Sequence, residues 1–475
     1  MALGRRESRK QENLWIATQD LPKAVSHPFY SKLNEILAKH GFDQYIEEMT
    51  ARFYAPKNGR PSLPPGNYFR LLFIGYFEGI ASERGIAWRV ADSLGLRHFL
   101  GFSLTDNTPD HSTMSKIRRR IDLETHNEIF SFVLQILARE KILVGKSIGI
   151  DATTLEANAA MRGIVRRDTG ATYQEFLTEL AKESGIETPT KEELLRFDRK
   201  RKKKTSNKEW ESPVDPDSRI AKMKNGSTKL AHKVEHAVDL DSGAIVGITL
   251  QGADLGDTTT IHETVRETLL SLAGATTNEG DPSLRESIIS EVIADKGYHS
   301  SGALLELTEF GTNPIIAEPD RGRRKWDGKK EEQNATYANR RRIRSNRGKS
   351  LMRQRGELVE RSFAHCYETG GMRHIFLRGH SNILRRLFAH IAGFNLSLIM
   401  RKIFGKGTPR GFGDLPKCLW RALGNFLIFI LSTVFNKVES HVQDSQFFHQ
   451  HFQVSNYLAC QTECSKKPKW EIMAP

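Results

Sequence analysis

Hydrophobic residues in the first third of the chain recur at helical spacing. Over Tyr68–Leu100 the apolar positions fall three and four residues apart, as on the buried face of amphipathic helices. Helices are also predicted over Asn107–Arg120, which opens with a Pro turn and Ser/Thr capping positions, and over Leu123–Glu140. A shorter helical pattern lies near Tyr30–Thr50. We therefore expect an all-α N-terminal domain over residues 1–140.

After Gly145 the pattern changes to short apolar runs that are typical of strands. Strands are predicted at Ser147–Asp151 (SIGID), Ile288–Asp295 (IISEVIAD) and Asn313–Ala317, and a hairpin at Lys229–Asp239 and Ala244–Gln251. Helices are predicted between and after these strands, at Asp257–Ala273, Ser301–Phe310, Leu351–Glu368 and Asn382–Ile403. This alternation indicates an α/β layer fold whose hairpin makes the sheet mixed. The topology resembles a ribonuclease-H-like fold, with flanking helices, over residues 146–404.

Two regions interrupt or follow this α/β pattern. A polar insertion at about residues 162–225 contains the dense cationic block Arg196–Lys208, which is typical of a polyanion-binding arm. A second cationic segment, Arg321–Lys349, has twelve Lys/Arg against three Asp/Glu. Residues 405–475 lack clear order and are interpreted as a variable C-terminal tail. The apolar run Phe426–Phe435 in that tail is too short to span a bilayer and is interpreted as a buried helix or strand.

The composition indicates a partner of opposite charge. The 475 residues carry a formal net charge of +14, which favours binding to a polyanion such as nucleic acid. Only four cysteines are present, so a disulfide scaffold is excluded and a reducing cytosol is expected. Cys460 and Cys464 lack the CxxC spacing of a zinc site and are interpreted as unrelated thiols. The charged N-terminus lacks the apolar core of a signal peptide, so we expect a cytoplasmic protein without a membrane partner.

Three acidic residues in separate segments are the strongest chemical signal. Asp151 and Asp295 end two predicted strands, and Glu360 lies in the helix-like stretch Gly356–His365. Carboxylates at strand ends and on a later helix can converge on one point, and oxygen ligands suit Mg²⁺ or Mn²⁺. Two such ions, about 3.5–4 Å apart, can activate a water or hydroxyl and stabilise the leaving oxygen in phosphoryl transfer. We therefore predict a two-ion site for chemistry on nucleic acid.

The candidate site residues also have simpler interpretations. An Asp at a strand end is often a turn-former or a helix cap, and Asp257 is interpreted as a helix N-cap. Lys296 and Tyr298 are candidates for DNA phosphate contact and base stacking, or they are simply part of a turn after the strand. Arg118 and Arg119 are candidates for contact with the DNA backbone, or they form a solvated helix face.

Several motifs, in order, resemble bacterial insertion-sequence transposases of the DDE type over roughly residues 1–413. The segments that carry the resemblance are PSLPPGNYFRLLFIGYFEGIASE (61–83), TPDHSTMS (108–115), IDATTLEANAAMRGIVRRD (150–168), ADLGDTTT (253–260), ADKGYHS (294–300) and RGELVERSFAHCYETGGMR (355–373). The resemblance implies Asp151, Asp295 and Glu360 as the catalytic triad. It also implies an N-terminal DNA-binding domain and a homo-oligomer that brings two transposon ends together.

The third acid departs from the signature of the broader group, in which Tyr, Arg, Glu and Lys are spaced by two, three and six residues. Anchored on Glu360, this spacing places Arg353, Gly356 and Tyr367 at the Tyr, Arg and Lys positions, so none of the three matches. Anchored on Glu357, it places Ser350, Arg353 and Ala364 there, so only the Arg matches. Val359-Glu360-Arg361 nevertheless resembles the usual acid site of the family, so Glu360 is preferred. Arg355, Arg361 and Tyr367 are candidate substitutes for the missing phosphate contacts.

The sequence thus predicts a DDE transposase that cleaves the ends of an insertion sequence in double-stranded DNA and joins them to target DNA. The imperfect signature around Glu360 and the C-terminal tail leave an alternative, a catalytically inactive or repurposed DNA-binding protein. A ribonuclease-H-like nuclease without strand transfer is the third hypothesis.

Overall fold

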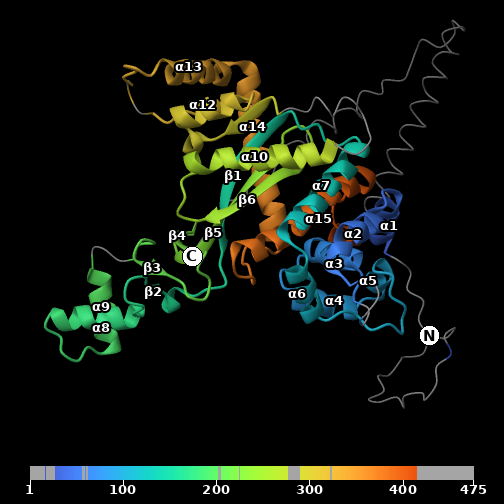
Figure 1. The fold of residues 1–475 in the computed structure, drawn as a ribbon, viewed down its shortest axis with the longest axis horizontal. Helices are drawn as coiled ribbons and strands as arrows, with labels where there is room; N and C mark the ends of the chain where they lie inside the picture. The colour runs from blue at the N-terminus through green and yellow to red at the C-terminus, as the bar shows by residue number, and fades with distance from the viewer. Residues whose placement is uncertain are drawn as a thin grey trace, which may run out of the picture. The chain divides into compact units, whose positions relative to one another are not determined.

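The architecture was determined from a computed structural model (Figure 1). The structure describes residues 27–55, 62–201, 205–223, 225–276, 289–320 and 324–414, together with residues 17, 59 and 322. The expected variable tail lies outside the described residues from residue 415 onward, and so do Phe426–Phe435 and the two tail cysteines.

The first part of the chain is helical, as predicted. Its helices are α1 (Pro28–Lys39), α2 (Phe42–Thr50), α3 (Pro65–Glu78), α4 (Glu83–Ala91), α5 (Leu94–Phe99), α6 (His111–Arg120) and α7 (Leu123–Arg139), and a 3₁₀ turn, η2 (Ala51–Phe53), follows α2. Side chains cap several N-termini: Ser82, Ser93, Asp110 and Asp122 each accept a hydrogen bond from a backbone N–H in the first turn. These caps explain why α4 to α7 begin where they do.

The last long helix, α15 (His380–Phe404), packs among these N-terminal helices, against α3 and α7. Gly393 allows this close approach, since a Cβ there would lie 3.1 Å from Cβ of Tyr76. The fully buried Arg386 donates to the backbone carbonyls of Leu72 and Ile80. Among the described segments, His380–Phe412 is long and apolar enough to cross a membrane, but 83% of its most apolar window is buried inside the protein. That burial is typical of a core helix.

The central sheet is mixed. Its six strands are β1 (Ser147–Glu156), β4 (Arg219–Lys222), β5 (Thr228–Asp239), β6 (Ile245–Gly252), β7 (Glu291–Ala294) and β8 (Asn313–Ile316). β4 and β6 both pair antiparallel with β5, which pairs antiparallel with β1; β7 and β8 then continue parallel to β1. The predicted β5–β6 hairpin and the predicted mixed sheet are therefore confirmed.

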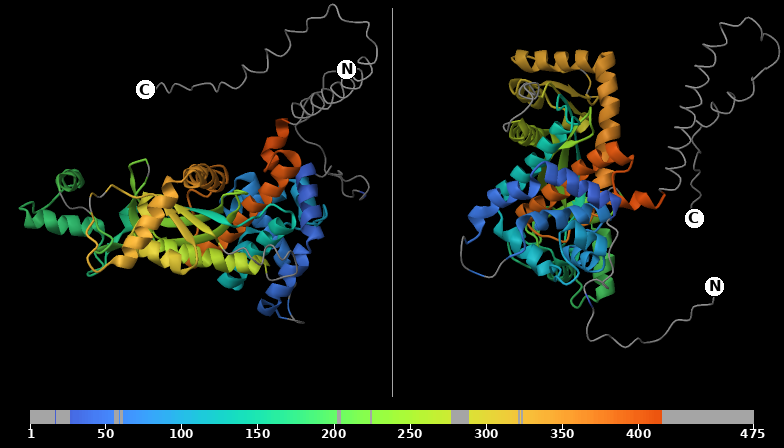
Figure 2. Two further views of the ribbon diagram at one scale, coloured as in Figure 1. Left: turned by 90° about the horizontal axis from the view of Figure 1, so that it is seen from above. Right: turned by 90° about the vertical axis from the view of Figure 1, so that its right-hand side faces the viewer.

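Helices cover both faces of this sheet. Glu235 of β5 accepts hydrogen bonds from Thr260 and Thr264 of α10 (Asp257–Thr276), whereas the next residue, His236, contacts Ser362 of α14 (Asn346–Phe363). Because successive strand residues point to opposite faces, α10 and α14 lie on opposite sides of the sheet (Figure 2). α12 (Ser301–Glu309) connects β7 to β8, and a π-helical turn, η5 (Ala364–Thr369), continues α14.

On each side of the sheet, a buried asparagine pairs with one residue of an outer strand. Asn339 of α13 (Lys330–Arg344) accepts from the N–H and donates to the carbonyl of Ile316 in β8. Asn395 of α15 makes the same two bonds to Ile245 in β6. Each amide thus occupies the place of a further strand and leaves no open edge for pairing at these positions. The sequence pattern did not predict α13, because its cationic residues hide the helical period.

The expected insertion is folded rather than an open arm. It contains β2 (Val165–Arg166), β3 (Trp210–Glu211), α8 (Tyr173–Glu183), α9 (Lys191–Lys200) and a short turn, η3 (Met161–Gly163) (Figure 1). Capping boxes begin both helices, with Thr172 and Glu175 at α8 and Thr190 and Glu193 at α9. Buried Trp210 forms a small core with Ala157, Ile164 and Leu230. The cationic block therefore starts within α9.

Candidate functional site

The two predicted strand acids lie side by side at two adjacent central strands of the sheet, β1 and β7. Parallel pairing aligns Gly149 of β1 with Ile293 of β7, so two residues further along each chain lie Asp151 and Asp295. One guanidinium nitrogen joins them: Nη2 of Arg355 lies 3.0 Å from Oδ2 of Asp151 and 4.0 Å from Oδ2 of Asp295. The backbone register therefore brings the two carboxylates together, although 144 residues separate them in sequence.

The two acids have different backbone settings. Asp295 directly follows β7, as predicted, and caps the 3₁₀ turn η4 (Lys296–Tyr298) by accepting the Gly297 N–H at 2.8 Å. Asp151 does not end its strand: β1 continues to Glu156 because β5 pairs with it along its whole length, with His236 opposite Asp151. The expected strand end at Asp151 was therefore wrong; the apolar run stops there because the rest of β1 mixes polar and apolar residues.

Both carboxylates remain accessible. The side chains of Asp151 and Asp295 are 33% and 44% exposed. Burial raises the pKa of Asp151, and the neighbouring Arg355 opposes this shift. Two neighbouring ionised carboxylates would repel each other without a cation, and in this structure the Arg355 guanidinium is that cation.

The third predicted acid lies apart from this pair. Val359 of α14 is buried, and Glu360, the next residue, is exposed. Glu357 is also exposed and forms an ion pair with Arg361 one turn later. No group of three or more His, Cys, Asp or Glu side chains that could hold a metal ion occurs within the described part of the chain. The structure thus brings together Asp151 and Asp295 but not Glu360.

A polar network lies behind the site, on the α10 face of the sheet. Lys233 is buried, and its Nζ lies 2.9 Å from Oε1 of Glu235 and 2.6 Å from Oδ1 of Asp257. Tyr298 is fully buried and donates to Glu235 at 3.2 Å, so its ring is not available to stack on a DNA base. Asp257 begins α10, but its carboxylate pairs with Lys233. Lys233 and Glu235, two charged residues on one face of the buried strand β5, were the signal for this network, which the sequence reasoning missed.

The other candidate DNA contacts divide by exposure. Arg118 is buried in an ion pair with Glu83 of α4, and Arg355 is buried against β1, so neither presents its guanidinium to solvent. Arg119, Lys296 and Arg361 are exposed. Arg118 is therefore a structural residue that joins α6 to α4, which corrects the expectation that it contacts the DNA backbone or forms a solvated helix face.

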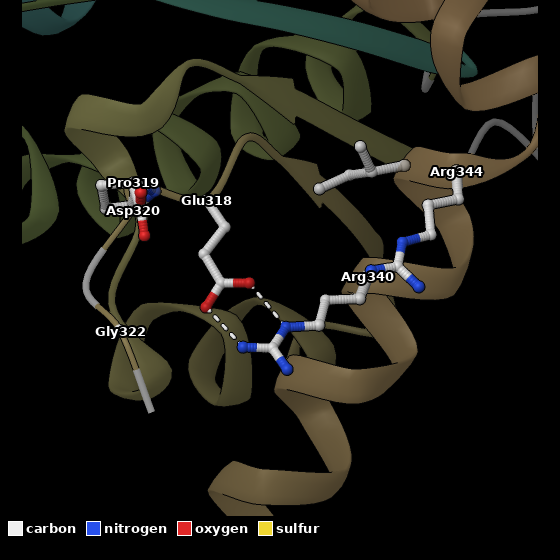
Figure 3. Close-up of a pocket in the computed structure, with 7 residues that line it drawn as sticks. Glu318, Pro319, Asp320, Gly322, Arg340 and Arg344 are labelled. Carbon is white, nitrogen blue, oxygen red and sulfur yellow. Dashed lines mark hydrogen bonds and ion pairs between the residues drawn. The ribbon is translucent and has the colours of Figure 1, made fainter. Parts of the chain in front are cut away.

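A cavity of about 410 Å³ lies beyond the end of β8, the neighbour of β7 (Figure 3). It is lined by Glu318, Pro319, Asp320, Gly322, Arg340, Ile343 and Arg344. Glu318 accepts two hydrogen bonds from Arg340, at 2.6 and 2.9 Å, and lies 3.0 Å from Arg324. These contacts hold the pKa of Glu318 below its usual value, Arg340 most strongly. A carboxylate neutralised by two arginines is a poor metal ligand, so Glu318 does not indicate a second metal centre.

Comparison with known protein families finds two matching domains. Residues 19–120 match a transposase domain (DUF772), and residues 189–396 match the transposase DDE domain. The second match includes Asp295 and Glu360, whereas Asp151 precedes it. No curated protein and no solved structure gave a significant match.

The two matched domains, in this order, define a DNA-processing enzyme of a mobile element. The chain belongs to the insertion-sequence DDE transposases. Members of this family bind DNA and generally use divalent metal ions.

Proposed function

We propose that this protein cleaves DNA at the ends of its insertion sequence and transfers the exposed strand into target DNA, in a metal-dependent reaction. The observation that carries the proposal is that Asp151 and Asp295, at adjacent strands of a mixed sheet, both lie close to the Arg355 guanidinium. Oxygen ligands on adjacent parallel strands suit phosphoryl transfer, and the family supplies DNA as the substrate.

The sheet order supports a ribonuclease-H-like core. An antiparallel hairpin, β5–β6, lies on one side of β1, and two parallel strands, β7 and β8, lie on the other. The helix α14 then follows and carries Glu360. We propose the helices before β1 as the DNA-binding domain and the segment between β1 and β5 as an insertion in the core.

The residues present fit a divalent metal. Mg²⁺ is commonly held by one or two carboxylates together with substrate phosphate, which matches the donor set of Asp151 and Asp295. We propose these two as ligands and Glu360 as the third, with two Mg²⁺ or Mn²⁺ ions expected. When bound, such ions activate the attacking water or 3′-hydroxyl and stabilise the leaving oxygen.

The chain's own residues would position these groups. The β1–β7 register holds the two aspartates side by side, and the Gly297 N–H orients the Asp295 carboxylate. Exposed Lys296, next to Asp295, is placed to meet a DNA phosphate, and Arg119 and Arg361 are further candidates for backbone contact. Cleavage at two ends also requires at least two active sites, so we propose a homo-oligomer.

The test is strand cleavage of end-containing DNA with Mg²⁺. Asp151→Ala and Asp295→Ala should abolish cleavage while DNA binding persists, and the exposed Asp320→Asn should cleave at the wild-type rate. Separate Glu357→Ala and Glu360→Ala variants identify the third acid. Wild-type cleavage by Asp151→Ala would refute the site.

One observation favours the second candidate, an inactive or repurposed DNA-binding protein. Glu360 is exposed, and the described residues hold no cluster of three ligands. Tight, end-specific binding by the wild-type protein without any metal-dependent nicking would select this function. Nicked products without joined products would instead indicate a nuclease.

A further inference from the structure

The side chain of Arg355 packs against β1, in space that Gly149 leaves open. Its stem crosses β1 at Gly149, where a Cβ would lie 3.1 Å from Cγ of Arg355 and 3.2 Å from Cγ2 of Val359. Nε of Arg355 donates to the carbonyl of Ile150 at 3.0 Å, and the residue is 8% exposed. A side chain at position 149 would fill this path, so the glycine leaves room for the arginine.

The other end of the guanidinium lies where positive charge is needed for catalysis. Nη2 is close to both Asp151 and Asp295, yet it makes no well-directed hydrogen bond to either. The contact is therefore held by charge and by the Nε bond, not by a bidentate pair. A divalent ion that binds between the same two carboxylates would meet this guanidinium at close range and be repelled by it.

We propose that Arg355 is the internal counter-ion of the Asp151–Asp295 pair and competes with divalent metal for it. The inference rests on the proposed metal site and adds how that site is regulated: metal binds weakly until the guanidinium leaves. Arg355 is a positioning residue in this scheme. A DNA phosphate offers the displaced guanidinium a matching partner, because its planar fork suits phosphate oxygens.

The experiment measures Mn²⁺ binding to the full chain, without DNA, by electron paramagnetic resonance of free Mn²⁺. Arg355→Gln should bind Mn²⁺ about tenfold more tightly than wild type, because a competing charge is gone. Arg355→Lys keeps the charge without the planar fork and should lie between the two. Arg353→Gln is the matched control: it removes an exposed arginine from the same helix and should change the affinity less than about twofold.

Folding is followed in the same samples. Arg355→Gln leaves the two carboxylates without their cation, so its melting temperature should fall without metal and recover with Mn²⁺ by more than that of wild type. Mn²⁺ affinity of Arg355→Gln that equals or falls below that of wild type, in a protein that Mn²⁺ does not stabilise further, would overturn the proposal.

Different results would refute the proposed metal site and the proposed competition by Arg355. If neither wild type nor Arg355→Gln binds Mn²⁺, with or without end-containing DNA, the metal site itself is wrong, and with it the proposed function. If wild type binds Mn²⁺ in the presence of DNA but removal of Arg355 leaves the DNA-free affinity unchanged, the site stands and only the competition by Arg355 is refuted.

Discussion

Replacement of Gly149 by alanine tests the packing between β1 and α14 most directly. An ideal Cβ at this position would lie 2.7 Å from Cδ2 of Leu240, 3.1 Å from Cγ of Arg355 and 3.2 Å from Cγ2 of Val359. The first contact is closer than real Cβ atoms come, so the Leu240 side chain must move, and the two contacts with α14 are also tighter than usual. Overpacking of a tight core commonly costs about 1–3 kcal/mol. We expect Gly149→Ala to lower the free energy of unfolding by about 2 kcal/mol.

Gly356→Ala, on the exposed side of α14, is the matched control. A Cβ there meets nothing within 4 Å, and alanine favours a helix interior over glycine by about 1 kcal/mol. This variant should therefore be more stable than wild type. Urea denaturation, followed by circular dichroism, measures both changes at once. The predicted overpacking is contradicted if Gly149→Ala is as stable as wild type, or if the free energies of unfolding of both variants shift in the same direction.

Three further predictions concern the interior. Lys233→Met leaves the carboxylate of Glu235 buried without its cation and should lower the free energy of unfolding by about 3–5 kcal/mol, measured by urea denaturation. Adding Glu235→Gln should recover much of this loss. If stability does not recover, the unpaired charge is not the cause. Asn339→Ala and Asn395→Ala each leave a backbone N–H and carbonyl at a sheet edge unpaired and should cost about 1–3 kcal/mol, whereas exposed Asn334→Ala should be neutral. Burial lowers the pKa of His126 from 6.5 to about 4, so the unfolded chain binds a proton that the folded chain does not; stability should fall as the pH drops from 6.5 to 4, and His126→Gln should flatten this part of a stability–pH curve.

Most secondary structure could be predicted because the hydrophobic period was clear. The β5–β6 hairpin, β7, α10, α14 and α15 all lie within a few residues of their predicted bounds. The failures share a physical cause, namely polar residues that are satisfied by tertiary contacts. β1 continues past Asp151 because β5 pairs with it, and α13 is stabilised by Asn339 at the edge of β8, although its surface is cationic. Neither contact leaves a local signal in the sequence.

The candidate site was predictable only in part, for a similar reason. Asp295 could be found because it ends an apolar run, and its alignment with Asp151 follows once β1 and β7 pair in parallel. Arg355 was predicted only as a candidate phosphate contact, and its burial against β1 was not predicted. Its burial depends on the glycine in β1, more than 200 residues earlier in the chain. No local pattern relates an arginine on a helix to a gap in a distant strand.

The same difference separates Asp151 and Asp295 from the third predicted acid. Asp151 and Asp295 are held by the hydrogen-bond register of two adjacent strands, which a change in a neighbouring helix does not alter. Glu360 depends instead on the rotation and position of α14, since each residue turns about 100° around a helix and the adjacent Val359 already faces the sheet. Arg355 and Glu360 belong to one element, α14, which packs against the sheet and makes side-chain hydrogen bonds to it from Arg355 and Ser362. A displacement of α14 would therefore shift Arg355 and Glu360 together, because both lie on this helix, whereas Asp151 and Asp295 lie on or directly after strands.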